Sequence, residues 1–112
     1  MSRLIAERFG VYLVRLDPAV GAEMRKTRPC VVVSPDEMHR NVHTILVAPM
    51  TSTLTAFPTR VRSTFGGTVG EIALDQLRAV DYLRVVKRLG RLDATTAQAL
   101  TKALSVLFSP PP

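Results

Sequence analysis

Short apolar runs, separated by turn residues, fill the first three quarters of the chain. The most continuous run is Cys-Val-Val-Val at positions 30–33, which is followed by Ser34 and Pro35. Three consecutive β-branched residues without a polar interruption predict a strand over 30–34 that is buried on both faces, at the centre of a small sheet. Pro29 biases the residue before it toward an extended conformation, so we expect the Arg28 side chain to be held at the mouth of this strand.

Other runs predict further strands of the same sheet. Each is rich in β-branched or aromatic residues and is bounded by proline or glycine. The predicted strands are 9–16, 42–48, 59–63 and 69–74, with Gly70 a candidate bulge, and a shorter extended piece at 78–81. The segments 19–27 and 50–57 are predicted loops, and 35–41 is predicted to be a loop or a single helical turn.

The remainder of the chain is helical in character. Asp93 can cap a helix by accepting a backbone N–H. Behind it, apolar residues recur at spacings of three and four, which is the pattern of one helix face: Ala97, Leu100, Leu104 and Leu107. Five short strands and one C-terminal helix predict a mainly β (α+β) fold, a small antiparallel barrel with the helix packed on it, as a single domain over 1–112.

The charge of the chain narrows the class of partner. Its net charge is +6, and a small basic domain usually binds nucleic acid, a membrane surface or an acidic protein. No run approaches the ~20 apolar residues that span a bilayer. The first ten residues carry Arg3, Glu7 and Arg8 in place of the apolar core of a signal peptide. We therefore expect a cytoplasmic protein without a membrane partner.

Few side chains in the sequence suit a metal or a thiol nucleophile. Cys30 is the only cysteine, which excludes an internal disulfide and a multi-cysteine metal site. Within an apolar run its thiol is expected to be buried and inert, with a reactive thiol as the alternative. His39 and His43 are four residues apart, but the residues between them resemble a loop entering a strand, which argues against a metal pair. We predict no metal and no cofactor.

Four motifs carry a family resemblance when they are taken in order. They are Gly10-Val11-Tyr12 with Leu16-Asp17-Pro18; Gly21-Ala22-Glu23 leading to Arg28-Pro29 and Val31-Val32-Val33-Ser34; Ala48-Pro49-Met50-Thr51-Ser52; and Leu74-Asp75-Gln76-Leu77-Arg78-Ala79-Val80-Asp81. Each motif alone is common. Their order and spacing, over nearly the whole chain, resemble the MazF/PemK family of toxin endoribonucleases, also called mRNA interferases.

The resemblance implies an SH3-like barrel, a homodimer, and sequence-specific, metal-independent cleavage of single-stranded RNA that inhibits translation and growth. Products with 2′,3′-cyclic phosphate and 5′-hydroxyl ends, and neutralisation by a cognate acidic antitoxin of the MazE type, are implied as well. By the family's assignment, Arg28 and Thr51 are the catalytic pair. Substrate-binding residues are expected in the groove and its two loops: Glu23, Arg25, Lys26, Ser52, Asp75 and Gln76.

Two positions depart from the family pattern. Some members have a histidine directly before the Arg-Pro pair, where this chain has Thr27. PemK-type members have an arginine two residues before the Asp-Gln pair, where this chain has Ala73. A mechanism that needs either residue is excluded here, so more of the chemistry is expected to depend on Arg28 and Thr51.

Cleavage of RNA without a metal places two demands on the site. The 2′-hydroxyl attacks the phosphorus, negative charge develops on the non-bridging oxygens, and the leaving 5′ oxygen needs a proton. Arg28 offers a rigid fork for phosphate and Thr51 a hydroxyl, and such fixed donors are typically worth ~3–4 kcal/mol each. Arginine stays protonated, so it is poorly suited to be a general base. Glu23 is the nearest candidate base by position, or alternatively it reads a base edge.

Each candidate residue also has a structural interpretation. Arg28 could form an ion pair with Glu23 or Asp17, Thr51 could be a turn hydroxyl, and the Asp-Gln pair could simply end a strand. Arginines 60 and 62 are expected on one strand face opposite Val61, either solvated or in contact with phosphates. No site role is assigned to the cations that follow: Arg84, Lys87, Arg88 and Arg91.

Two other functions compete with the nuclease. A CcdB-like toxin of the same barrel type would poison DNA gyrase without cutting RNA, but such proteins need neither the Arg-Pro nor the Thr-Ser motif. A non-catalytic RNA-binding module would be consistent with the charge alone. Only 5% of the residues are aromatic, so base recognition is expected to depend on hydrogen bonds from loops 19–27 and 50–57 more than on stacking.

Overall fold

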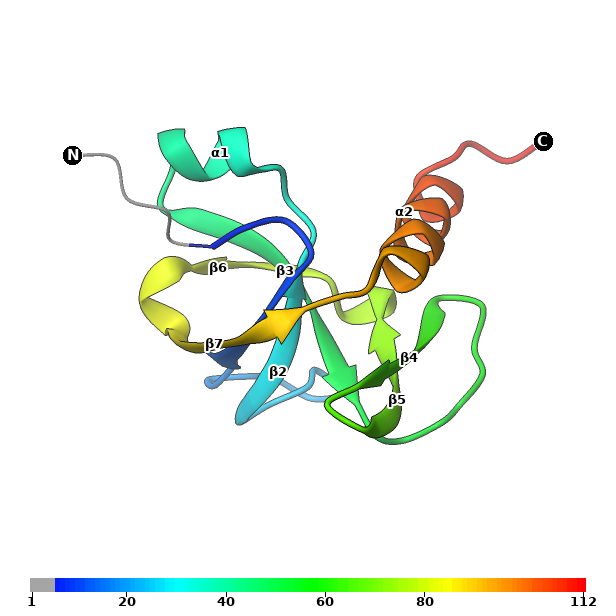
Figure 1. The fold of residues 1–112 in the computed structure, drawn as a ribbon, viewed down its shortest axis with the longest axis horizontal. Helices are drawn as coiled ribbons and strands as arrows, with labels where there is room; N and C mark the ends of the chain where they lie inside the picture. Colours follow the sequence, from blue (N-terminus) through cyan, green and yellow to red (C-terminus); the bar gives the residue numbers. More distant parts are fainter. Residues whose placement is uncertain (1–5) are drawn as a thin grey trace.

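The computed structural model describes residues 6–112 as a curled antiparallel sheet with one long helix packed against it (Figure 1). The strands are β1 (Gly10–Arg15), β2 (Thr27–Val32), β3 (Thr44–Thr51), β4 (Arg60–Phe65), β5 (Thr68–Ala73), β6 (Arg78–Asp81) and β7 (Val85–Arg91). The helices are α1 (Asp36–Asn41) and α2 (Ala94–Leu107), with 3₁₀ turns η1 (Leu74–Gln76) and η2 (Tyr82–Arg84). The predicted fold class, a mainly β antiparallel barrel with a C-terminal helix, is confirmed.

The central strand of the sheet is β2, as predicted. The strand order is β4-β5-β3-β2-β1-β7, and β6 pairs with the first half of β3. On the edge away from β2, β3 therefore pairs first with β6 and then, at Met50 and Thr51, with β5. This change of partner curls the sheet and brings the β4–β5 hairpin alongside the end of β3 (Figure 1).

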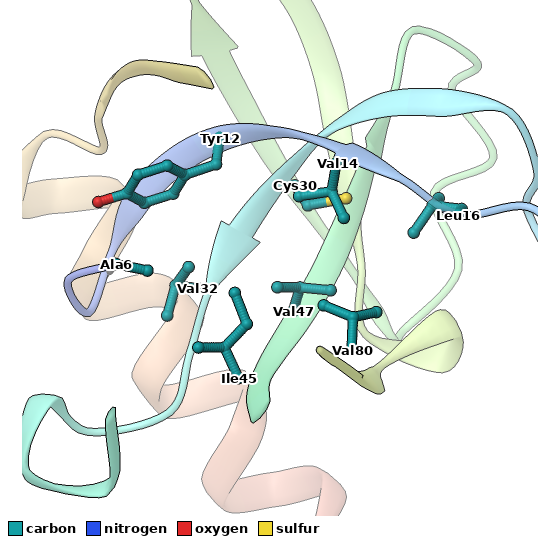
Figure 2. Packing of buried hydrophobic residues seen from close by; sticks show 9 residues of the cluster. All are labelled: Ala6, Tyr12, Val14, Leu16, Cys30, Val32, Ile45, Val47 and Val80. Carbon is teal, nitrogen blue, oxygen red and sulfur yellow. The ribbon is translucent and has the colours of Figure 1, made fainter. Parts of the chain in front are cut away.

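Both faces of β2 are buried, which confirms the interpretation of its apolar run. Cys30 and Val32 point into a core inside the curl of the sheet, between side chains of β1, β3 and β6 (Figure 2). Val31 and the following Val33 face the other way, into a second core that includes Leu100 of α2. Alternate side chains of a strand leave opposite faces, so one four-residue run supplies both cores.

Helix α2 begins at its predicted cap. The Asp93 carboxylate accepts the backbone N–H of Thr96 at 2.7 Å, which satisfies one free donor of the first turn. Leu100 is fully buried, and Ala97 and Leu104 pack against the same core. Leu107 is 39% exposed, so the apolar stripe was predicted one turn too long.

Strand β2 begins earlier than predicted. Thr27 and Arg28 belong to it, and Arg28 pairs with Val14 of β1. Arg28 therefore lies within the strand and not at its mouth, because the ladder with β1 extends the pairing beyond the apolar run. Val33 and Ser34, expected in this strand, lie outside it.

Strand β3 runs through Pro49, which was expected to end it, so Met50 and Thr51 are strand residues and not loop residues. Pro49 lies at the gap between the two partners of β3, after Val47 has paired with β6 and before Met50 pairs with β5. The N–H that proline lacks would point into this gap, where it would complete no ladder hydrogen bond.

The largest error of the sequence prediction is strand β7, which was expected to be helical. Its sequence, Val-Val-Lys-Arg-Leu-Gly-Arg, does not alternate, and most of its side chains are exposed because it pairs only with β1, at the edge of the sheet. Gly70 is not a bulge either, since the β4–β5 register continues through it without a shift. None of the helices within residues 6–112 is long and apolar enough to cross a membrane.

Candidate functional site

Arg28 and Thr51 line the same pocket, of about 430 Å³, which we call the Arg28 pocket. Its walls come from the start of β2, the end of β3 and the β4–β5 hairpin. Arg25, Lys26 and Ser52, three of the predicted substrate-binding residues, line it as well. The structure thus brings together the two predicted catalytic residues with exposed cations and a hydroxyl at its rim.

The Arg28 side chain is half-buried and keeps its charge available. Its Nε donates to the carbonyl oxygen of Arg25 at 3.1 Å, which fixes the direction of the guanidinium. Within residues 6–112 no carboxylate forms an ion pair with it, so the alternative of pairing with Glu23 or Asp17 is wrong. The two terminal nitrogens remain able to donate to an anion in the pocket.

The Thr51 hydroxyl already accepts one hydrogen bond. Its Oγ1 accepts the backbone N–H of Thr53 at 3.1 Å, an interaction typical of turns, so the hydroxyl proton is left to donate. The backbone of Thr51 lies directly over Gly70, where a Cβ would collide with the Thr51 carbonyl oxygen. Glycine is therefore required at position 70 by the close approach of β3, and not by a bulge.

The other predicted substrate-binding residues lie elsewhere. Glu23, Asp75 and Gln76 line a second pocket, of about 390 Å³, together with Arg78. Gln76 accepts the backbone N–H of Met24 at 3.0 Å and so ties the 19–26 loop to η1. The Glu23 carboxylate accepts the backbone N–H of Val20 at 2.7 Å. The sequence prediction therefore describes two neighbouring pockets, not one.

Asp75 is paired with Arg60. Arg60 donates from Nε to Oδ1 at 2.7 Å and from Nη2 to Oδ2 at 3.2 Å, and the hydroxyl of Thr59 donates at 3.1 Å. These hydrogen bonds, first of all the one from Arg60, hold the pKa of Asp75 below its ordinary value. Arg60 pairs in register with Ala73, so an arginine from β4 occupies the space beside the Asp-Gln motif.

Arg60 is not the solvated or phosphate-binding arginine that the strand pattern suggested. Its side chain is only 9% exposed, whereas Arg62, two residues later on the same face, is exposed. Arg60 also lies 3.5 Å from a carboxylate oxygen of Glu71. We call Arg60, Glu71 and Asp75 the Arg60 cluster.

Glu71 is the functional-site residue that the sequence prediction missed. It is 2% exposed and lines the Arg28 pocket from β5. Its carboxylate accepts the backbone N–H groups of Thr55 (3.1 Å) and Ala56 (2.8 Å) and the Thr55 hydroxyl (3.0 Å). Despite burial these donors, led by the Ala56 N–H, lower its pKa. A glutamate inside an otherwise apolar strand was the available signal, because buried carboxylates are almost always paired.

Two other reactive-looking groups are structural. Cys30 is buried and its surroundings raise the pKa of its thiol to about 12, although Arg78 and Arg28 act in the opposite direction. His39 is buried on α1, with Nδ1 donating to the carbonyl oxygen of Ala6 at 2.8 Å and Nε2 lying 2.6 Å from the hydroxyl of Ser34. Among residues 6–112 no three histidine, cysteine, aspartate or glutamate side chains are grouped so that they could hold a metal ion.

The chain was compared with known families, curated proteins and solved structures. Residues 7–108 match the family model for the PemK-like, MazF-like toxin of type II toxin-antitoxin systems. Endoribonuclease PemK of Escherichia coli is 31% identical over 109 residues, which cover 92% of this chain and 82% of that protein. Endoribonuclease EndoA of Bacillus subtilis is 29% identical over 92% of this chain and 94% of its own.

Solved structures show the same fold. MazF from Deinococcus radiodurans superposes with a TM-score of 0.81 and 22% identity, covering 91% of this chain and 94% of that one. A mycobacterial endoribonuclease, solved in complex with its cognate antitoxin, superposes with a TM-score of 0.79 and 21% identity over 96% and 99% of the two chains. The chain belongs to the PemK-like, MazF-like family of type II toxins.

Proposed function

We propose that the protein is an endoribonuclease toxin that cleaves single-stranded RNA in the Arg28 pocket by a metal-independent reaction. The observation that carries the proposal is the pairing, in one pocket, of a guanidinium without a carboxylate partner among residues 6–112 and a hydroxyl that already accepts a backbone N–H. Both groups are placed to donate, which suits a phosphodiester whose non-bridging oxygens gain negative charge.

The proposed reaction is a transesterification. The 2′-oxygen forms a bond to phosphorus as the bond from phosphorus to the 5′-oxygen breaks, which leaves a 2′,3′-cyclic phosphate and a 5′-hydroxyl. Arg28 and Thr51 donate to the non-bridging oxygens, and Arg28 is also able to donate toward the leaving oxygen. Neither Arg28, always protonated, nor Glu71, saturated with donors, is suited to be the base. The 2′ proton therefore passes to solvent water, and the departing 5′-oxygen takes up a proton from water to become the 5′-hydroxyl.

Glu23 is better suited to recognition than to proton transfer. It lines the second pocket with Gln76 and Asp75, apart from the two donors of the Arg28 pocket. Polar groups in a pocket separate from the one that would hold the scissile phosphate suit hydrogen bonds to base edges, which is how single-stranded RNA is read specifically. Arg25 and Lys26, both exposed at the rim, would follow the backbone.

A direct assay tests the proposal. A long single-stranded RNA is incubated in EDTA with the wild-type protein, with Arg28→Ala, and with Arg62→Ala, a matched removal of an exposed arginine outside the pocket. We expect specific cuts with cyclic-phosphate ends from the wild type and from Arg62→Ala, and none from Arg28→Ala. RNA that is bound but intact would contradict the nuclease and indicate a binding module. Intact RNA together with stalled complexes in a parallel incubation with DNA and DNA gyrase would contradict the nuclease and indicate a gyrase poison.

The partners are proposed on the same basis. The proposed antitoxin is acidic, because Arg25, Lys26 and Arg28 line a cationic pocket that an acidic segment would occupy in competition with RNA. A homodimer is proposed as the functional unit, since two-fold symmetry would provide two equivalent pockets. Light scattering of the purified protein tests the dimer, and loss of cleavage on addition of a small acidic protein that co-purifies with this chain tests the antitoxin.

A further inference from the structure

Glu71 lines the Arg28 pocket, and its carboxylate also accepts several hydrogen bonds from the loop after Thr51. It is the register partner of Thr51 where β3 meets β5, so the two residues are direct neighbours across the ladder. Its carboxylate reaches past the end of β3 to the backbone of Thr55 and Ala56, in the loop that follows Thr51. Glu71 therefore contacts both ends of the short segment that carries the donor hydroxyl, the Thr51 end through the strand pairing and the Thr55–Ala56 end through its buried carboxylate.

The loop in turn fixes the Thr51 hydroxyl. Thr53 donates its N–H to Thr51 Oγ1, and Thr53 is two residues before the first backbone group that Glu71 holds. The exposed side chains of this loop include Leu54 at 50%, so apolar burial contributes little to its position. Without the Glu71 anchor, the loop would lose the hydrogen bonds that tie Thr55 and Ala56 to β5, and Thr51 Oγ1 would lose a fixed partner.

Arg60 completes the arrangement from the neighbouring strand. It faces Glu71 at 3.5 Å and is itself locked by Asp75, so the carboxylate is held between backbone donors on one side and a cation on the other. A carboxylate with this set of donors stays ionised and cannot take up a second role in proton transfer. Its neighbours leave it one function, to hold the loop.

We infer that Glu71 is a positioning residue, which acts through the 52–57 loop to keep the Thr51 hydroxyl aimed at the scissile phosphate. The inference rests on the proposed function and adds to it a residue that touches no substrate. Positioning of a reacting group affects the chemical step more than binding, since a small misplacement of a donor weakens its contact in the transition state.

The test is a double-mutant cycle. Glu71→Gln keeps the size of the side chain but turns an amide NH₂ toward backbone N–H groups, and Glu37→Gln, exposed on α1, is the matched control. We expect Glu71→Gln to lower kcat for a short RNA by on the order of 10- to 100-fold, with KM and the affinity for an RNA lacking the scissile 2′-hydroxyl within about twofold. Glu37→Gln should match the wild type.

The cycle is closed with Thr51→Val. If Glu71 acts through Thr51, the double variant will be no slower than Thr51→Val alone; independent losses that multiply would overturn the inference. Amide exchange gives a readout without RNA: the N–H groups of Thr55 and Ala56 should be protected in the wild type and exchange faster in Glu71→Gln. Equal exchange in the two proteins would also overturn it.

A milder variant covers the case in which Glu71→Gln does not fold. Thr55→Val removes only the hydroxyl that donates to Glu71 at 3.0 Å, and we expect a smaller fall in kcat with the same unchanged KM. The two proposals fail separately. A wild-type protein that leaves RNA intact refutes the nuclease, whereas an active wild type with a fully active Glu71→Gln refutes the positioning role alone.

Discussion

Arg28 and Arg60 are two arginines of one small sheet that have different partners and different roles. Each lies on a strand and each was a candidate for contact with phosphate. Arg60 directs its donors to Asp75 and Glu71, and its charge is neutralised inside the protein. Arg28 directs one donor to a backbone carbonyl, which fixes the guanidinium without neutralising it. An arginine bound by a neutral acceptor is prepared to bind an anion, and one bound by carboxylates is a structural element.

The largest expected effect is the loss of RNA cleavage in Arg28→Lys. Lysine keeps the charge but loses the fork and the Nε hydrogen bond, so cleavage should fall on the order of 100-fold. The thermal midpoint should stay close to that of the wild type, since Arg28 forms no ion pair within the described part of the chain. Cleavage assays and calorimetry measure both quantities. A stable protein with full activity would show that only charge, and not geometry, matters at this position.

Arg60→Met tests the structural role of Arg60, and the measured quantity is the stability of the fold. The substitution leaves Asp75 and Glu71 without their cation, and we expect a loss of about 1–2 kcal/mol in the free energy of unfolding, measured in urea. Arg62→Met, the exposed neighbour on the same strand, should change it by less than about 0.5 kcal/mol. Equal effects of the two substitutions would contradict the structural role of Arg60.

The pH dependence of stability should distinguish the wild type from Arg60→Met. The pKa values of Asp75 and Glu71 are lowered in the folded protein. Both carboxylates therefore stabilise the fold at pH values above their pKa values in the unfolded chain. This contribution is lost as the pH falls through their pKa values in the folded protein. We expect the wild type to keep its stability down to about pH 5 and to lose it progressively below about pH 4. Denaturant titrations should show a flatter acid limb in Arg60→Met.

The smallest expected effect concerns Cys30, which is two residues from Arg28. Burial raises the pKa of its thiol to about 12, although the charge of Arg28 acts in the opposite direction. At pH 8 a thiol reagent should therefore modify the native protein only as fast as it unfolds, and Arg28→Ala should not change this rate measurably. Rapid modification of the folded wild type would contradict the burial of the Cys30 thiol.

The sequence alone predicted the parts of the molecule that depend on local pattern. The uninterrupted run 30–33 identified the central strand, and Asp93 identified the start of α2. Both features depend on residues that are close together in the sequence, so the local pattern was enough to predict them. The order of the family motifs was enough to assign Arg28 and Thr51 to one site, and the two residues do line one pocket. Their roles in cleavage stay predictions until the variants are assayed.

The parts that were missed depend on partners far along the chain. Strand β7 is held by β1 across more than seventy positions, and its own residues show no strand period. Arg60 looked like a solvated arginine because Asp75, which it binds, is fifteen residues away on another element. Glu71 differs, since a lone carboxylate within an apolar strand was visible in the sequence and only its partners were not.

Because Thr51 Oγ1 accepts a backbone N–H, the hydroxyl is left to act as a hydrogen-bond donor in the pocket. Together with Arg28, Arg25 and Lys26, the Thr51 hydroxyl turns protons and positive charge toward the pocket. Anions such as phosphate or sulfate would compete for this space, whereas amines and polyamines would be repelled from it. The choice of buffer anion thus becomes a variable in every measurement made on this protein.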